Sequence, residues 1–93
     1  MCRDLEAVRQ SVCDYAKVFD AGSMIPAEAG RVVSLCAAIE GSVATLKALA
    51  AARLADGGSW RSEGYRSAEE QLADRTGVGT GQARRQLQNG RRL

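Results

Sequence analysis

The polar side chains near the C-terminus offer the clearest candidate chemistry in this sequence. The segment "TGQARRQLQNGRRL" contains arginine, glutamine and asparagine but no acidic residue. Arginine neutralises phosphate groups, and all three residue types form paired hydrogen bonds with the edges of bases. Their presence on one helix would predict contact with DNA. The candidate DNA-binding residues are Thr80, Gln82, Arg84, Arg85, Gln88, Asn89, Arg91 and Arg92.

Positive charge is concentrated at this end of the chain, although the whole 93-residue sequence has a net charge of only +2. Residues 1–74 carry eight Lys or Arg and eleven Asp or Glu, a net charge of −3. Residues 75–93 carry five arginines and no acid, a net charge of +5. This division is typical of proteins that bind polyanions. A basic tail that only keeps the chain soluble would have the same composition.

The residue patterns of most enzymatic sites are missing. The sequence contains no histidine, and its "GVGTG" run lacks the lysine of a phosphate-binding loop. Glu69 and Glu70 fall at a predicted helix start, where the helix dipole accounts for them. Cys36 is expected to be a buried, unreactive thiol on an apolar helix face. We therefore predict no enzymatic activity, no cofactor and no metal.

The cysteines and the apolar segments indicate a reducing compartment. The three cysteines cannot all pair within one chain, and none belongs to a CxxC motif. The N-terminus alternates charged and apolar residues, unlike a signal peptide. The most apolar stretch, residues 32–54, is interrupted by Glu40, Lys47 and Arg53, so we predict no membrane span. The expected location is cytoplasmic.

The elements that would carry the candidate site are helices. Proline occurs once and the aromatic residues number four, so strands have little material to form from. A first amphipathic helix is predicted from apolar residues spaced three and four apart. It should end near the "DAGSM" segment. The spaced residues are Leu5, Val8, Val12, Tyr15 and Phe19.

A second, much longer helix is predicted from Pro26 to the Gly57–Gly58 pair. At roughly 30 residues it would be about 45 Å long. Its apolar residues form a stripe too long for one short helix to cover, so we predict a homo-oligomer. The predicted oligomer interface consists of Val32, Leu35, Ile39, Val43, Leu46 and Leu49.

The C-terminal third has the spacing of a helix-turn-helix pair. Ser67 and Glu70 form a capping box that begins one helix, and the helix should end near Thr76. Gly77 is placed to take the left-handed conformation at the turn. Val78 would fill the angle between the two helices, and the last helix would begin with Gly79 or Thr80 as its cap. Ala73, Ala83 and Leu87 would form the contact between the two helices.

The predicted fold is therefore all-α, a single helical domain over residues 1–93. Residues 1–57 would form a helical hairpin that mediates oligomerisation, and residues 58–93 a helix-turn-helix-like part.

Part of the chain resembles a known family. The run "LKALAAARLADGGSWRSEGYRSAEEQLADRTGVGTGQARRQL" is similar to the actinobacterial 13E12 repeat family, helical domains usually found N-terminal to an HNH endonuclease. This resemblance implies an all-helical module associated with DNA processing. Gln71 stands where the family often has an aromatic residue, and Gly79 where a Ser or Thr cap is common. The HNH half is missing, together with every histidine it would need. The similarity is carried by Ala52-Arg53-Leu54-Ala55, Gly58, Trp60, Gly64, Arg66-Ser67-Ala68, Leu72-Ala73, Arg75-Thr76-Gly77 and Ala83-Arg84-Arg85.

Two functions fit these patterns. One is a small DNA-binding protein that places its last helix in the major groove and dimerises through the long helix. The alternative is a protein-interaction module that docks on a nuclease or another helical partner. A fragment without activity of its own would share the same features.

Overall fold

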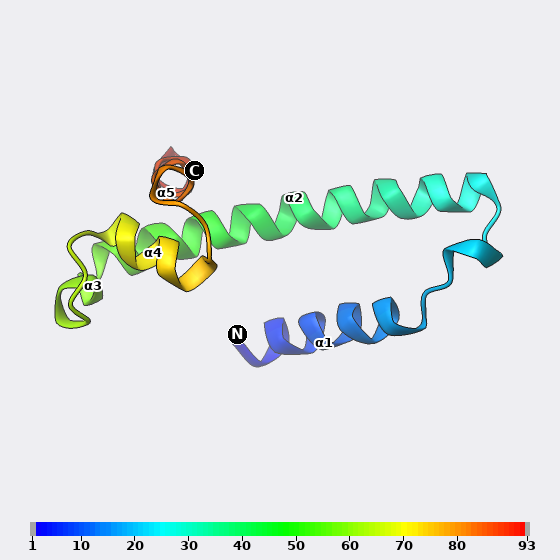
Figure 1. Ribbon diagram of the computed structural model, residues 1–93, viewed down its shortest axis with the longest axis horizontal. Helices are drawn as coiled ribbons and strands as arrows, with labels where there is room; N and C mark the ends of the chain where they lie inside the picture. The colour runs from blue at the N-terminus through cyan, green and yellow to red at the C-terminus, as the bar shows by residue number, and fades with distance from the viewer. Residues whose placement is uncertain (1, 93) are drawn as a thin grey trace. The chain divides into compact units, whose positions relative to one another are not determined.

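A computed structural model describes residues 2–92, which contain helices and no strand (Figure 1). This confirms the predicted all-α class, with a long helix that packs against C-terminal helices. The chain divides into two compact units, residues 1–35 and 36–93. The elements are α1 (Cys2–Val18), the 3-10 turn η1 (Ala21–Ser23), α2 (Pro26–Asp56), α3 (Ser59–Ser62), α4 (Ala68–Thr76) and α5 (Thr80–Arg92).

The first unit contains α1, whose apolar face is exposed in the single chain. Its five spaced apolar residues have exposed fractions between 39 and 62%. After α1, the Asp20 side chain accepts a hydrogen bond from the amide of Gly22 at 3.1 Å, which forms η1. This local bond accounts for the predicted break, and α2 then begins at Pro26 as predicted.

The part of α2 in the second unit, residues 36–56, has two different apolar faces. Ala48 and Ala51 are buried and Ala55 is half-buried, and their spacing places all three on one side of the helix. The six large apolar residues predicted as the oligomer interface, from Val32 to Leu49, are called the α2 stripe from here on. They lie about half a turn away around the helix. Leu46 is 54% exposed and Leu49 is 44% exposed. Small residues therefore pack against the other helices, while the large ones face outward.

One prediction about this helix was wrong. Cys36, expected to be buried, is exposed. The expectation assumed that the apolar face of α2 is covered within the chain. The helices of the second unit instead pack on the alanine face, so the thiol next to Leu35 remains accessible.

The α2 helix also has the length and composition of a membrane span. Its most apolar window of 18 residues has a mean hydropathy of 1.6 and is 6% buried. Core helices of soluble proteins and N-terminal signal sequences satisfy the same two criteria. The absence of a membrane span stays a prediction from the charges within the helix.

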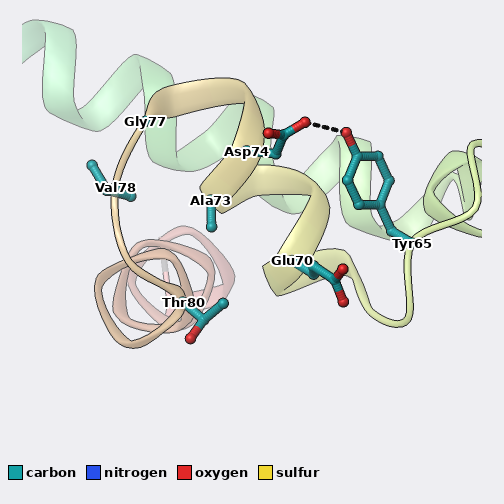
Figure 2. Close-up of a pocket in the computed structure, with 7 residues that line it drawn as sticks. All are labelled: Tyr65, Glu70, Ala73, Asp74, Gly77, Val78 and Thr80. Carbon is teal, nitrogen blue, oxygen red and sulfur yellow. Dashed lines mark hydrogen bonds between the residues drawn. The ribbon is translucent and has the colours of Figure 1, made fainter.

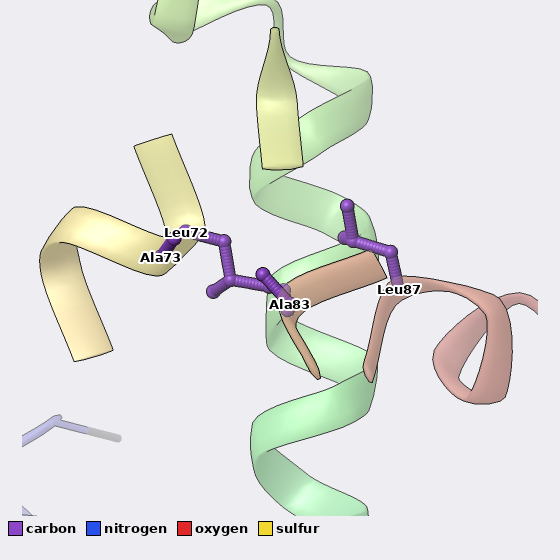
Figure 3. Close-up of a cluster of buried hydrophobic side chains, with 5 residues drawn as sticks. Leu72, Ala73, Ala83 and Leu87 are labelled. Carbon is purple, nitrogen blue, oxygen red and sulfur yellow. The ribbon is translucent and has the colours of Figure 1, made fainter. Parts of the chain in front are cut away.

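The core of the second unit is built largely from alanine (Figure 3). Ala83 has no exposed surface, and Leu87 has 1%. Because alanine side chains are short, the helix backbones can approach closely. Val78, Ala55 and Ala68 are partly buried at its edge. The cluster consists of Ala51, Leu72, Ala73, Ala83 and Leu87.

Gly90 is the point at which α5 crosses α2. A Cβ atom at this position would overlap the Ala48 carbonyl group, lying 2.8 Å from its carbon, and would lie 3.2 Å from the Cβ of Ala52. Figure 1 shows α5 almost end-on while α2 runs across the view, so the two helices cross steeply. Glycine permits direct contact between the two backbones. The sequence reading had given Gly90 no role.

A short helix that was not predicted, α3, is joined to α4 by a buried side chain. Gln71 is 1% exposed, and its Nε2 donates hydrogen bonds to Ser59 Oγ and Glu63 Oε2, each at 3.1 Å. Trp60 is half-buried, and the Arg61 guanidinium lies 4.9 Å from its ring centroid. The polar residue Gln71 thus holds α3 against α4.

Candidate nucleic-acid interface

The helix-turn-helix segment begins with a capped helix. The Glu70 amide donates to Ser67 Oγ at 3.1 Å, as the capping box predicts. The Glu70 carboxylate, however, accepts from the amide of Arg66 at 3.3 Å, one residue before the position expected. At the other end of α4, Thr76 Oγ1 donates to the carbonyl of Leu72 at 2.7 Å. Both ends of this nine-residue helix are therefore held by side chains.

The turn between α4 and α5 depends on Gly77. Its φ of +74° lies in the left-handed region, which confirms the predicted conformation. Its amide donates to the Ala73 carbonyl at 2.9 Å, and the amide of Val78 donates to the same carbonyl at 3.2 Å. These two bonds close the end of α4 and redirect the chain into the next helix.

Two further residues connect the turn to α5. Val78 is half-buried against the core cluster, the place the spacing had predicted for it. The carbonyl of Gly79 accepts a hydrogen bond from the amide of Ala83 at 3.0 Å, so Gly79 is the cap and α5 begins at Thr80. The connection is the three residues 77–79, a length typical of helix-turn-helix pairs.

The α5 helix divides into a packed side and an exposed side. Its buried residues are Ala83, Leu87 and Gly90. All eight candidate DNA-binding residues are exposed. The helix contains four arginines and no acid, so every charged side chain on its outward surface is basic.

The exposed surface of α5 is bounded on two sides. Asn89 and Arg92 border a shallow hollow whose other wall is formed by Ala44, Thr45 and Ala48 of α2. They therefore lie beside the long helix. Near the other end of α5, Thr80 borders a hollow formed mainly by α4 and the turn.

Five of the eight candidates line neither hollow and are exposed: Gln82, Arg84, Arg85, Gln88 and Arg91. Sequence reasoning placed all eight candidates on one helix, but it did not separate these five from Thr80, Asn89 and Arg92.

The hollow beside Thr80 is acidic (Figure 2). Tyr65 donates its hydroxyl hydrogen to the Asp74 carboxylate, and this bond, with burial and nearby negative charge, raises the pKa of Tyr65. Glu70 lines the same hollow. Together with Glu69, these carboxylates make the exposed part of α4 unfavourable for phosphate contact. A polyanion would therefore approach α5 rather than α4.

Within residues 2–92, no group of three or more cysteine, aspartate or glutamate side chains could hold a metal ion. The acidic hollow contains a tyrosine that donates to a carboxylate but no cysteine or lysine. Its polar groups stabilise the loop that precedes α4.

Comparisons with known proteins find no matching family model, no matching curated protein and no matching solved structure. The similarity to the 13E12 repeat family stays an expectation drawn from the residues quoted above.

Proposed function

We propose that this protein binds double-stranded DNA through α5, without enzymatic activity, and acts as a homodimer. The observation that carries this proposal is the division of α5. Three small or apolar residues pack it against the rest of the second unit, while eight candidate residues remain exposed on an acid-free helix.

The helix-turn-helix arrangement of α4 and α5 suggests how α5 would dock on DNA. In helix-turn-helix proteins the second helix lies in the major groove, and its N-terminal residues contact base edges. Here that position belongs to Thr80, Arg84 and Arg85. Arg91 and Arg92, one and a half turns or more further along, would contact phosphates at the edge of the groove.

The dimer is supported by the exposure of the α2 stripe. Leu35, Ile39 and Val43 are between 46 and 51% exposed in the single chain. A row of large apolar side chains in contact with water is unfavourable and marks an interaction surface. A dimer would also present two α5 helices to two half-sites.

The salt dependence of binding tests the DNA-binding proposal. Fluorescence anisotropy would be measured on a selected duplex and a random duplex over a range of salt concentrations. If roughly three arginines per protomer contact phosphates, log affinity should fall with log salt with a slope near −3 per protomer. Removing one phosphate contact should flatten that slope by about one. Removing a base contact should instead narrow the difference between the two duplexes by about 1–3 kcal/mol.

The variants are Arg84→Ala and Arg85→Ala, with Arg53→Ala as the matched control. All three remove one exposed arginine from a helix, but Arg53 lies near the end of α2. We expect the control to bind as the wild type does. Absence of salt-dependent binding at low ionic strength, or wild-type binding by both α5 variants, would refute the proposal.

One observation favours a protein-interaction module as the second candidate. Glu69 and Glu70 lie in the first turn of α4, the helix end that would otherwise attract a phosphate. Acids there oppose DNA binding and favour a basic protein surface. A chain that fails the anisotropy test but captures a defined helical partner through the α2 stripe would support this candidate.

A further inference from the structure

The middle of α2 carries two isolated charges, Glu40 and Lys47, both exposed. They are about 10.5 Å apart along the helix axis, too far for a pair within the helix. The positions three and four residues from each hold no charged residue. Near the ends of α2, by contrast, charged residues have oppositely charged neighbours within the helix. Glu28 lies three residues from Arg31, and Arg53 lies three residues from Asp56.

Glu40 and Lys47 lie on the same flank of the α2 stripe. Seven residues correspond to almost two full turns, so the two side chains are separated by only about 20° around the helix. They stand about 100–120° from the centre of the stripe, where charged residues border the apolar seam of a coiled coil. At those positions, ion pairs between helices set orientation and partner choice.

We propose that a second copy of the protein covers the α2 stripe with its own α2 in antiparallel orientation, so that Glu40 of each protomer faces Lys47 of the partner subunit. This inference rests on the dimer of the proposed function and specifies its geometry. A two-fold axis perpendicular to two antiparallel helices brings the same flank of each helix together. When that axis passes midway between Val43 and Ala44, Glu40 of each protomer lies level with Lys47 of the partner subunit. The dimer then contains two ion pairs.

A parallel dimer would leave these charges without partners. The symmetry axis would then run along the helices and bring opposite flanks together. The opposite flank of the stripe carries Ser34, Gly41 and Thr45, which are uncharged. Beyond them lies Ala48, which is buried under α5. Ala51, four residues after Lys47, is buried as well, so both flanks end at the covered face, but Glu40 and Lys47 are themselves exposed.

The α1 helix does not fit the stripe as well as a second α2. With 17 residues it is about as long as the stripe between residues 32 and 49, but it has no acidic and basic residue seven positions apart that could meet both Glu40 and Lys47. A second α2 has the same length and the complementary charges.

A charge-exchange experiment tests the antiparallel pairing. Sedimentation equilibrium without DNA would be measured at low salt for the wild type, Glu40→Lys, Lys47→Glu and the double exchange. Each single substitution replaces two attractions per dimer with two repulsions, and we expect dimer affinity to fall about tenfold. The double exchange should restore it.

The mixture of the two single variants is the most discriminating sample. In an antiparallel heterodimer, two lysines of one chain face two glutamates of the other, so the mixture should dimerise as well as the wild type. Glu6→Lys on α1 is the control for net charge, and we expect wild-type behaviour from it. Circular dichroism would verify that each variant keeps its helix content.

A wild type that is a monomer at tens of micromolar would overturn the inference, and so would single variants that dimerise normally. Failure of the mixture to recover would exclude the antiparallel arrangement even if each chain dimerises. Because these measurements contain no DNA, their failure is distinct from failure of DNA binding, which anisotropy reports separately.

Discussion

Replacing Gly90 with alanine should destabilise the protein, although the same change stabilises most helices. In an exposed helix interior, alanine is favoured over glycine by about 1 kcal/mol. At Gly90 the added Cβ would overlap the Ala48 carbonyl group and press against Ala52. Overpacking of this kind typically costs about 1–3 kcal/mol. We expect a net loss of up to about 2 kcal/mol in the free energy of unfolding, after the helix propensity gain is subtracted.

Gly81 supplies a matched control in the same helix. Nothing lies within 4 Å of a Cβ atom built at this position, and the residue is exposed. Gly81→Ala should therefore raise the free energy of unfolding by a fraction of 1 kcal/mol, up to about that value. Because the helix propensity gain applies to both, the two alanine variants should differ by the overpacking cost, roughly 1–3 kcal/mol.

Urea denaturation followed by circular dichroism would measure both variants. In a chain of this length, 1 kcal/mol corresponds to about 4–8 °C in melting temperature, so thermal melts should resolve the difference. If Gly90→Ala stabilises the protein as much as Gly81→Ala does, α5 does not cross α2 at this residue. The close packing described for the second unit would then be refuted.

The remaining predictions concern the turn and the loop that precedes α4. Gly77→Val should cost about 1–2 kcal/mol because a β-branched residue is strained at a φ of +74°. Gly77→Asn should cost less, and equal melting temperatures for wild type and Gly77→Val would contradict the proposed turn. Tyr65→Phe should lower stability at neutral pH by removing the hydrogen bond to Asp74. Folding raises the pKa of Tyr65 above 10.0. The stabilisation by this hydrogen bond is therefore complete below pH 10 and is lost as the pH rises through the folded-state pKa. The melting-temperature difference between wild type and Tyr65→Phe should therefore shrink above pH 10, and a constant difference would refute this account.

The helix boundaries were readable from the sequence because the interactions that set them are local. The Ser67 hydroxyl reaches an amide three residues away, and the Gly77 amide reaches a carbonyl four residues away. The start of α2 at Pro26 and its end before the diglycine depend on the same kind of short-range chemistry. Only α3 was missed, since a helix of four residues is too short to show a periodic pattern.

Part of the candidate site could also be predicted from the sequence, because helical periodicity is a local property. The spacing of Ala83 and Leu87 predicted which side of the last helix packs, and both residues are buried. The opposite side could be listed from helical periodicity alone. The sequence could not show that Asn89 borders α2 or that Thr80 borders an acidic hollow. Those relations depend on how separate helices pack.

The identities of the buried residues were decided by tertiary structure. Gln71 is polar and yet buried, because its partners on and just after α3 lie eight and twelve residues away in the sequence. Gly90 is buried because α5 crosses a helix turn more than forty residues earlier in the chain. Cys36 is exposed because the other helices pack on the alanine face of α2. The sequence determined which segments are helical and which sides of them are apolar, since both follow from neighbouring residues. Which apolar side is covered within the chain depends on contacts between distant segments, and only the folded arrangement decides it.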